Sequence, residues 1–436
     1  MDTGYIAIII VAVIFIGYVT EVLPIPILAL LSCGAMVVFG VAPAGTAWSA
    51  FGEDSVLLMA GMLTVGISLF STGAVSVITK RINRISKGNA EISIFIMLIL
   101  VFILSAFLNN TTVTVLFLPL ILGEIIEQND TSKYYEQKYV QAIAIVAQTG
   151  GLLTLVGSGV NVAASGILES YGYKGFSFFE FTPMAVILFV ISMVYIYTLG
   201  PSLSKKMNQR NPRSQLVLDF MEEHQNAEDQ KKENIDTKKM ATSISIMVIM
   251  SILLMTKELH GISSGTIGIL AGLFCVILKC ISFQEMIKKI NWGTLLTLGG
   301  TIGCAKCLAY SGGGNIIAMF LINLFKDSLT PRLATIVFMI SALIISQFIS
   351  NTGAVGILIP VCIPIAQALG VDPLPLVAAI TIAASCSILT PMASHIEALI
   401  IDWGSYKFND YLVYAGPLVA VYILVIIFTI PLFYPF

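Results

Sequence analysis

The segments LNNTTVTVLFLPL at 108–120 and ISNTGAVGILIPV at 349–361 each place asparagine and threonine inside strongly apolar sequence. They lie within two long apolar stretches, 92–127 and 333–369, which are interrupted at the centre by these polar residues. Polar groups at that position are costly in a continuous membrane helix. The pattern therefore predicts two re-entrant hairpins, each a pair of helices joined by a polar tip.

The two tips, Asn109–Thr111 and Ser350–Thr352, are 241 residues apart along the chain. A second pair of similar segments, LLMAGMLTVG at 57–66 and LLTLGGTIGC at 295–304, is 238 residues apart. Nearly constant spacing over several segments indicates an ancestral duplication. Internal repeats with interruptions at matching places are typical of secondary transporters, and the interruptions point to the substrate site.

The composition predicts an all-α polytopic membrane protein. Of 436 residues, 57% are hydrophobic and only 11% are charged, against roughly 25% charged in soluble domains. A large soluble protein would need charged surface that this chain lacks. Apolar runs of about 17–20 residues recur, long enough to cross ~30 Å of hydrocarbon. Full spans are expected near 5–20, 25–42, 55–78, 139–170, 183–200, 241–256, 263–281, 293–312, 374–402 and 411–433.

The motifs that carry enzyme chemistry are missing from the sequence. It has no Walker A motif and no His/Cys metal cluster, so neither ATP-driven transport nor an enzyme is expected, and no organic cofactor. The seven cysteines lie in or beside apolar segments, and C-x-x-C at Cys304 and Cys307 is interpreted as helix packing. The net charge of −2 gives no reason to expect nucleic acid as a partner.

The chain divides into two halves, 1–200 and 241–436, joined by a hydrophilic connector at 201–240. With 92–127 and 333–369 as re-entrant hairpins, each half has five full crossings, and an odd number makes the two repeats inverted. A cytoplasmic connector then leaves eighteen basic residues inside and four outside. This satisfies the positive-inside rule and places both termini outside the cytoplasm, in a multi-pass plasma-membrane protein such as one of a bacterial inner membrane.

Each hairpin tip is expected to face a broken helix, GSGVN at Gly157–Asn161 or TPMASHIE at Thr390–Glu397. Carbonyl and amide oxygens there could coordinate a hard cation such as Na⁺, and helix N-termini could hold an anion. No Arg or Lys lies at either tip. A bound carboxylate or sulfate would therefore be neutralised by bound cations, and this coupling predicts symport.

These residues resemble a known family, the divalent anion:sodium symporters (DASS, solute carrier family 13) of the ion transporter superfamily. The resemblance covers nearly the full length. Its motifs are SNT at 350–352, its partner NNT at 109–111, TEVLP at 20–24, FSFFEFTP at 176–183 and YKFNDYL at 406–412.

The resemblance implies a homodimeric, elevator-type carrier in the lipid bilayer, with a scaffold domain and a moving transport domain. A first Na⁺ site would involve Ser105, Asn109, Asn110 and Gly157. A second would involve Ser346, Asn351 and the carbonyl of Ala393. The anion would contact Asn110, Thr111, Ser158, Ser350, Asn351, Thr352 and Ser394. Serines at 105 and 346 lie one helical turn before each tip, on the same helix face.

The sequence departs from the family pattern around the anion. The family's Gly-Thr-Pro-Pro-Asn element reads GSGVN in the first half and ASHIE (Ala393–Glu397) in the second, and Asn109 replaces a serine. His395 and Glu397 are ionisable residues at membrane depth, which default to functional hypotheses. Glu397 could sense pH or bind a cation, and His395 could donate to the anion. Alternatively the two pair with each other or reach an aqueous face.

Three classes of function are weighed. The first is Na⁺-coupled symport of a small divalent anion, either a di- or tricarboxylate such as succinate or malate, or sulfate. The second is antiport, as anion exchange or Na⁺/H⁺ exchange. A proton antiporter should bury carboxylates near both tips, and only Glu397 qualifies. The third, a channel or membrane-bound enzyme, is disfavoured by the inverted repeat and by the missing catalytic motifs. Lys306, alone within a span, and Glu21 are expected to form ion pairs or to reach toward the interface.

Overall fold

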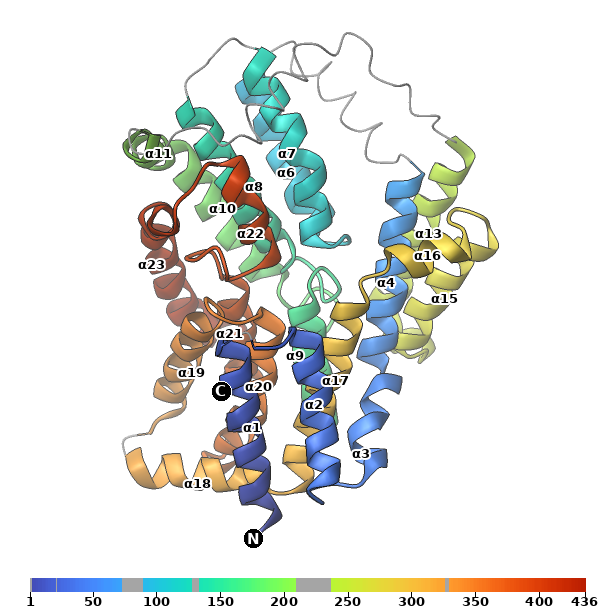
Figure 1. Ribbon diagram of the computed structural model, residues 1–436, viewed down its shortest axis with the longest axis vertical. Coiled ribbons are helices and arrows are strands. Elements are labelled where there is room, and N and C mark those ends of the chain that lie inside the picture. Colours follow the sequence, from blue (N-terminus) through green and yellow to red (C-terminus); the bar gives the residue numbers. More distant parts are fainter. Residues whose placement is uncertain (1, 21, 73–88, 128–132, 209–236, 326–328) are drawn as a thin grey trace.

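The computed structural model describes residues 2–20, 22–72, 89–127, 133–208, 237–325 and 329–436, and all secondary structure in these ranges is helical (Figure 1). Most of the connector at 201–240 and Glu21 lie outside the described residues. So does the basic segment KRINRISK at 80–87, for which the sequence predicts an interfacial cytoplasmic helix. The first half contains α1 (Thr3–Thr20), α2 (Ile25–Val38), α3 (Ala44–Trp48), η1 (Ser49–Gly52), α4 (Asp54–Ser71), α6 (Ala90–Ser105), α7 (Asn110–Glu127), α8 (Lys133–Gly150), α9 (Gly159–Ser170), α10 (Thr182–Thr198) and α11 (Gly200–Asn208). The second contains α13 (Thr237–Met255), α14 (Lys257–His260), α15 (Ser264–Ile277), α16 (Phe283–Lys289), α17 (Trp292–Tyr310), α18 (Gly313–Phe325), α19 (Pro331–Ile345), α20 (Asn351–Ala368), α21 (Leu374–Ser385), α22 (His395–Trp403) and α23 (Phe408–Phe433).

Many of these helices could enter or cross a membrane. Among the described residues, four helical segments are long and apolar enough to span one: Ala44–Leu69, Thr237–Met255, Asn351–Ala368 and Phe408–Phe433. Thr182–Thr198 and Gly200–Met207 form a bent pair at 56°, and seven further apolar helices have 10–17 residues. The expected full spans at 139–170 and 374–402 are each two helices with a break between them. In both of these expected spans, the apolar sequence therefore extends beyond the end of the first helix and into the break.

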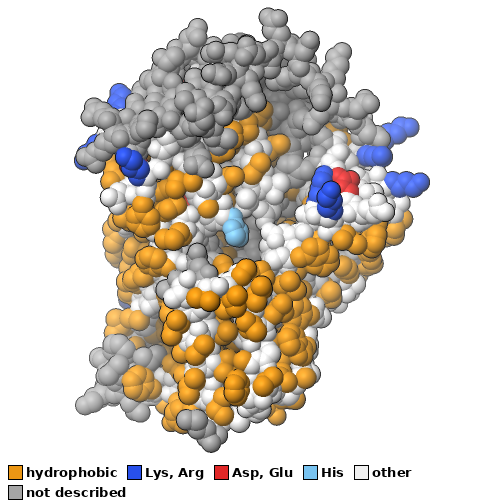
Figure 2. Space-filling model, viewed as in Figure 1, with side chains coloured by type: hydrophobic (Ala, Val, Ile, Leu, Met, Phe, Trp, Pro, Cys, Tyr) orange, Lys and Arg blue, Asp and Glu red, His pale blue; other side chains and the backbone are white. Residues whose placement is uncertain are grey.

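The outer surface of the molecule is strongly apolar. Figure 2 shows hydrophobic side chains over most of the lower and middle part of one face, with lysine and arginine side chains toward its upper end. Large side chains such as Val38, Phe428 and Leu432 are more than 70% exposed. So broad an apolar surface suits contact with lipid rather than with water.

Two helix pairs organise one side of the molecule: α2 packs along α17, and α4 packs along α15. Glycine permits both close approaches. A Cβ placed on Gly61 of α4 would lie 1.9 Å from the carbonyl oxygen of Gly268 on α15, and one on Gly300 of α17 would lie 2.7 Å from that of Ala29 on α2. Small residues at such crossings let membrane helices pack backbone to backbone.

The interrupted stretches form the other side. Helices α6 and α7 pack on each other and on α8, while α19 and α20 pack on each other and on α21 (Figure 1). Asn109 and Ser350 lie in the short connections between the two helices of each pair, and the other tip residues begin α7 and α20. Helix α9 and helix α20 connect the two sides, because both pack against α17.

The two breaks begin earlier in the chain than expected. The first covers residues 151–158 rather than starting at Gly157, and the second covers 386–394 rather than starting at Thr390. Capping explains where each ends. The Ser158 hydroxyl accepts from the Val160 amide at 3.3 Å, and the Ser394 hydroxyl accepts from the Glu397 amide at 3.3 Å. A serine that satisfies a free amide of the first turn starts the next helix.

Lys306 of α17 forms a side-chain ion pair with Glu53, next to η1. Its side chain is 18% exposed and that of Glu53 is 32% exposed. The expectation of an ion pair for Lys306 is therefore confirmed. The pair ties the η1 turn to α17, which also packs against α3.

Candidate substrate and cation site

The first tip connects Ser105, the last residue of α6, to Asn110, the first of α7. The exposed Asn109 caps α7, since its Oδ1 accepts from the amides of Thr111 at 3.0 Å and Thr112 at 3.4 Å. By contrast, Ser105 Oγ and Asn110 Oδ1 are buried and have no hydrogen-bond partner among the described residues. A buried polar atom without a partner costs about 1–3 kcal/mol, so these two oxygens are candidate ligands for a bound group.

Backbone oxygens converge on the same place. A Cβ built on Gly157 would lie 2.7 Å from Gly151 O, 2.9 Å from Ser105 O and 3.1 Å from Ala106 O. Only glycine allows carbonyls of the tip and of the break to approach so closely. A Cβ on Gly151 would likewise lie 2.4 Å from Asn110 Nδ2. Hard cations such as Na⁺ bind through carbonyl, amide and hydroxyl oxygens, so these residues fit the cation that the sequence predicts.

The second tip repeats most of this arrangement. Ser350 caps α20, its Oγ accepting from the Gly353 amide at 3.1 Å. The Asn351 Oδ1 is buried without a partner among the described residues, as is that of Asn110. Ser346 and Ala393 are both fully buried. The Ser346 hydroxyl differs from that of Ser105 because it donates to Leu343 O at 3.0 Å, although its lone pairs remain as acceptors.

A threonine from each break holds the adjacent tip. Thr154 Oγ1 donates to Ala106 O at 2.5 Å, and Thr390 Oγ1 donates to Gln347 O at 2.5 Å. Ala106 and Gln347 directly follow the serines at 105 and 346. Gln347 Oε1 also accepts from the Leu389 amide at 2.9 Å. Sequence reasoning did not single out Thr154 or Gln347. For Thr154 the signal was a threonine at the matching place in the other half, Thr390, whereas the residue that matches Gln347 is Ala106 and gives no such signal.

The two halves meet at these residues. A Cβ on Gly159, the first residue of α9, would lie 3.8 Å from Thr352 Oγ1 of the other tip. On the other side, Gln148 Nε2 of α8 donates to Ser394 Oγ at 3.2 Å. Thr111, Ser158, Ser350 and Thr352 are partly exposed, so their polar groups border open space.

Four helices begin at the expected anion contacts: α7 at Asn110, α9 directly after Ser158, α20 at Asn351 and α22 directly after Ser394. The N-terminal end of a helix carries about half a positive charge and free amide donors. Helix α9 packs against α20 and α7 packs against α22, and the distance from Gly159 to Thr352 places the N-terminal ends of α9 and α20 close together. With no Arg or Lys at the tips, helix N-termini and bound cations would have to supply the positive potential.

His395 and Glu397 are not a pair. The His395 side chain is exposed, whereas Glu397 is fully buried, and no hydrogen bond or ion pair between them is present in the described structure. The Glu397 carboxylate instead accepts from Gln141 Nε2 at 3.2 Å and from Gln148 Nε2 at 3.1 Å. Neither glutamine was predicted from the sequence. Both lie on α8 at positions that share a face with the buried Gln137.

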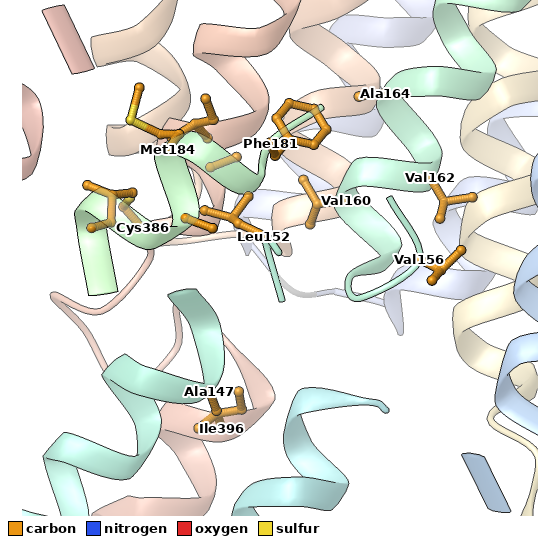
Figure 3. Close-up of a cluster of buried hydrophobic side chains, with 14 of the residues drawn as sticks. Ala147, Leu152, Val156, Val160, Val162, Ala164, Phe181, Met184, Cys386 and Ile396 are labelled. Carbon is orange, nitrogen blue, oxygen red and sulfur yellow. The ribbon is translucent and has the colours of Figure 1, made fainter. Parts of the chain in front are cut away.

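Apolar packing fixes the broken helices behind the polar groups. Figure 3 shows Ala147 of α8 next to Ile396 of α22, and Leu152, Val156 and Val160 around the first break. All five side chains are at least 92% buried. A separate small cavity lies between α1, α2, α17 and α20, but its lining, which includes Ser32, Thr301 and Cys304, contains none of the expected site residues.

Comparison with known proteins identifies the family. A family model described as citrate transporter matches residues 10–343 and 317–436, nearly the whole chain. The chain belongs to the citrate transporter family. Membership makes it a multi-pass membrane transporter and not an enzyme, and it agrees with the resemblance found in the sequence.

Individual relatives of this citrate transporter family member are distant. The chain is 25% identical over 417 residues to an uncharacterized transporter of Haemophilus influenzae, covering 92% of this chain and 85% of the relative. It is 23% identical over 421 residues to the sodium-dependent dicarboxylate transporter SdcS of Staphylococcus aureus strain USA300, covering 90% and 79%. The fold resembles that of the YdaH transporter of Alcanivorax borkumensis, with a TM-score of 0.54 at 12% identity, covering 89% and 87%.

Proposed function

We propose that this protein is a secondary active transporter that couples Na⁺ to the symport of a small divalent anion. The anion is a di- or tricarboxylate such as succinate or malate, or sulfate. The observation that carries the proposal is the pair of buried oxygens Asn110 Oδ1 and Asn351 Oδ1, which have no partner among the described residues. Each lies at the start of a helix, in a tip without Arg or Lys. Such a site needs cations to satisfy the oxygens and to neutralise the anion.

The proposed ligands follow the two tips. The first Na⁺ takes Ser105, Asn110 and the backbone around Gly157, with Asn109 acting through its cap of α7. The second takes Ser346, Asn351 and the Ala393 carbonyl. The anion lies between the four helix N-termini, with Thr111, Ser158, Ser350, Thr352 and Ser394 as further contacts.

An inverted repeat with an elevator movement is supported by the helix packing. In the repeat, α2 corresponds to α15 and α4 corresponds to α17. The packing of α2 against α17 therefore has its counterpart in the packing of α15 against α4. We propose that α1, α2, α4, α13, α15 and α17 form the scaffold, and that α6 to α10 and α19 to α23 move as the transport domain. The protein would act as a homodimer with both termini outside the cytoplasm. The sodium-dependent relative at 23% identity adds support for Na⁺ as the coupling ion.

The test is uptake of radiolabelled succinate, citrate and sulfate into proteoliposomes under an imposed Na⁺, K⁺ or pH gradient. We expect an inward Na⁺ gradient to drive accumulation of one of these anions, and K⁺ to fail. Uptake indifferent to Na⁺ would refute symport. Uptake that needs an anion inside the vesicle would instead show exchange. Na⁺/H⁺ exchange has less support, because the counterpart of Glu397 in the first half is the neutral Asn161.

A further inference from the structure

Asn161 and Glu397 occupy the same place in GSGVN and ASHIE, the fifth residue of each segment, but they differ in chemistry. Asn161 holds the first break by itself. Its fully buried Nδ2 donates to Gly151 O and to Thr154 O, both at 2.9 Å. These bonds tie the first turn of α9 to the start of the break. An ionised carboxylate at the matching position in the second half has no hydrogen to donate and cannot make them.

Gln148 supplies the missing donor from another helix. Its Nε2 lies 3.0 Å from Ser387 O. Ser387 lies six residues before Ala393 of ASHIE, just as Gly151 lies six residues before Gly157 of GSGVN. The same nitrogen lies 3.1 Å from Glu397 Oε1 and 3.2 Å from Ser394 Oγ. The second break is therefore held by a glutamine–glutamate pair, and this pair connects an ionisable group to an expected anion contact.

The carboxylate has no cationic partner in the described part of the chain. Glu397 is fully buried, and its hydrogen-bond donors are the uncharged Gln141 and Gln148. The titratable groups nearest on α23 and the segment before it are the tyrosines: Tyr411 donates to Glu397 O at 2.7 Å, and Tyr406 donates to Gln137 O. A buried, uncompensated charge in a membrane protein is costly.

Two basic side chains, one on α8 and one on α22, make no contact with Glu397 in the described structure. Lys138 on α8 lies 3.1 Å from Tyr139 OH, with its Nζ 4.6 Å from the centre of the Tyr197 ring on α10. His395 on α22 is exposed. A small cation must therefore balance the Glu397 charge if the helices around it move through the membrane.

We propose that Glu397 binds a proton during the transport cycle, and that Gln148 couples its protonation to the anion contact at Ser394. A metal ion would need the position among Ser387 O, Ser394 Oγ and Glu397 Oε1, and Gln148 Nε2 fills it. A proton needs no such space. It adds to a carboxylate oxygen on the loading side and leaves as a proton on the other side, with no further reactant.

The sign of the coupling follows from charge. Ionised Glu397 places a negative charge beside Ser394 and repels the anion, whereas the protonated form does not. Anion binding and proton binding therefore favour each other, and affinity for the anion should fall as pH rises through the titration of Glu397. This last step, unlike the titration itself, rests on the proposed anion transport.

The test is infrared spectroscopy of the full-length protein in lipid nanodiscs, titrated from about pH 5 to pH 9. We expect a carbonyl band of a protonated carboxylic acid that disappears as pH rises, is absent in Glu397→Gln, and persists in Glu285→Gln, a carboxylate of the exposed α16 turn. The absence of such a band from the wild-type spectra would overturn the proposal. That result needs only the wild-type protein, so it does not depend on whether a variant folds. A band that Glu397→Gln retains, in a protein with native helicity, overturns the assignment to Glu397.

The coupling is tested by repeating the wild-type titration with Na⁺ and citrate, succinate or sulfate, against K⁺ controls. We expect one anion to move the midpoint upward by about one pH unit, which is tenfold tighter proton binding. A titrating band that none of the anions moves overturns the coupling but not the protonation. Failure of the proposed Na⁺ symport shows separately, as Na⁺-independent uptake in proteoliposomes, and does not affect the anion-free titration.

Discussion

Gln148 Nε2 and Ser394 Oγ lie 3.2 Å apart although 246 positions separate the two residues along the chain. Gln148 belongs to α8 of the first half, and Ser394 precedes α22 of the second. A side chain of one half thus positions the broken helix of the other. The second break therefore depends on the first half for its geometry, and the sequence of the second break alone does not show this.

Replacing Asn110 or Asn351 by alanine should abolish Na⁺-dependent transport while the protein still inserts. Both Oδ1 atoms are buried without partners among the described residues, and alanine removes the oxygen that would bind the cation. Uptake in proteoliposomes should fall to the level of empty vesicles. Asn109→Ala is the matched control, because Asn109 is exposed and its Oδ1 already caps α7. We expect that variant to lose stability by about 1 kcal/mol and to keep transport. Wild-type uptake by Asn110→Ala would mean that the first cation site is misplaced.

Na⁺ should stabilise the protein against heat, and K⁺ should not. A ligand that binds only the folded state at one hundred times its Kd adds about 2.7 kcal/mol. Ser105 Oγ and Asn110 Oδ1 would gain a partner that the described residues do not provide. The melting temperature of the detergent-solubilised protein, measured against NaCl and KCl at equal ionic strength, checks this. Equal melting temperatures in the two salts would contradict a Na⁺ site at the tips.

Gly157→Ala should remove the Na⁺ response. The added Cβ would lie 2.7 Å from Gly151 O and 2.9 Å from Ser105 O, so the tip and the break must separate. Gly416→Ala is the matched control, since nothing lies within 4 Å of a Cβ there, and Gly416 is inside helix α23. We expect Gly416→Ala to keep or slightly raise stability. An unchanged Na⁺-dependent melting shift in Gly157→Ala would show that the carbonyls around it do not bind the ion.

The two threonines that hold the tips should have similar effects. Thr154→Val and Thr390→Val each remove one hydrogen bond to a tip carbonyl, and Val keeps the shape. The net loss is about 0.5–1.5 kcal/mol per bond, with more if the carbonyl is left unsatisfied. Chemical unfolding of the two variants measures it. If one substitution is silent and the other severe, the correspondence between the two breaks does not hold at these residues.

Much of this site followed from local sequence, and the remainder depended on packing between distant segments. Asparagine within an apolar stretch is enough to predict a hairpin tip, whereas Ser105 and Ser346 come from the family resemblance, with which the helical period agrees. Gln141 and Gln148 could not be predicted in the same way, because their role depends on which helix lies against α22. The predicted breaks begin too late in the chain, because the prediction starts them at the conspicuous residues Gly157 and Thr390. In the structure each break ends at a helix cap, Ser158 or Ser394.

Glu397→Asn should convert the second half to the chemistry of the first. The new side chain can donate to Ser387 O as Asn161 donates to Gly151 O, so the break no longer needs Gln148. We therefore expect Gln148→Ala to destabilise the wild type more than it destabilises Glu397→Asn. Residues in one hydrogen-bond network couple by about 0.5–3 kcal/mol, and a double-mutant cycle of unfolding free energies measures the coupling. The Glu397→Asn variant should also bind its anion with an affinity that no longer changes through the wild-type titration. Additive effects of the two substitutions would show that Gln148 and Glu397 act independently, and would leave Gln148 as a structural bond to Ser387 alone.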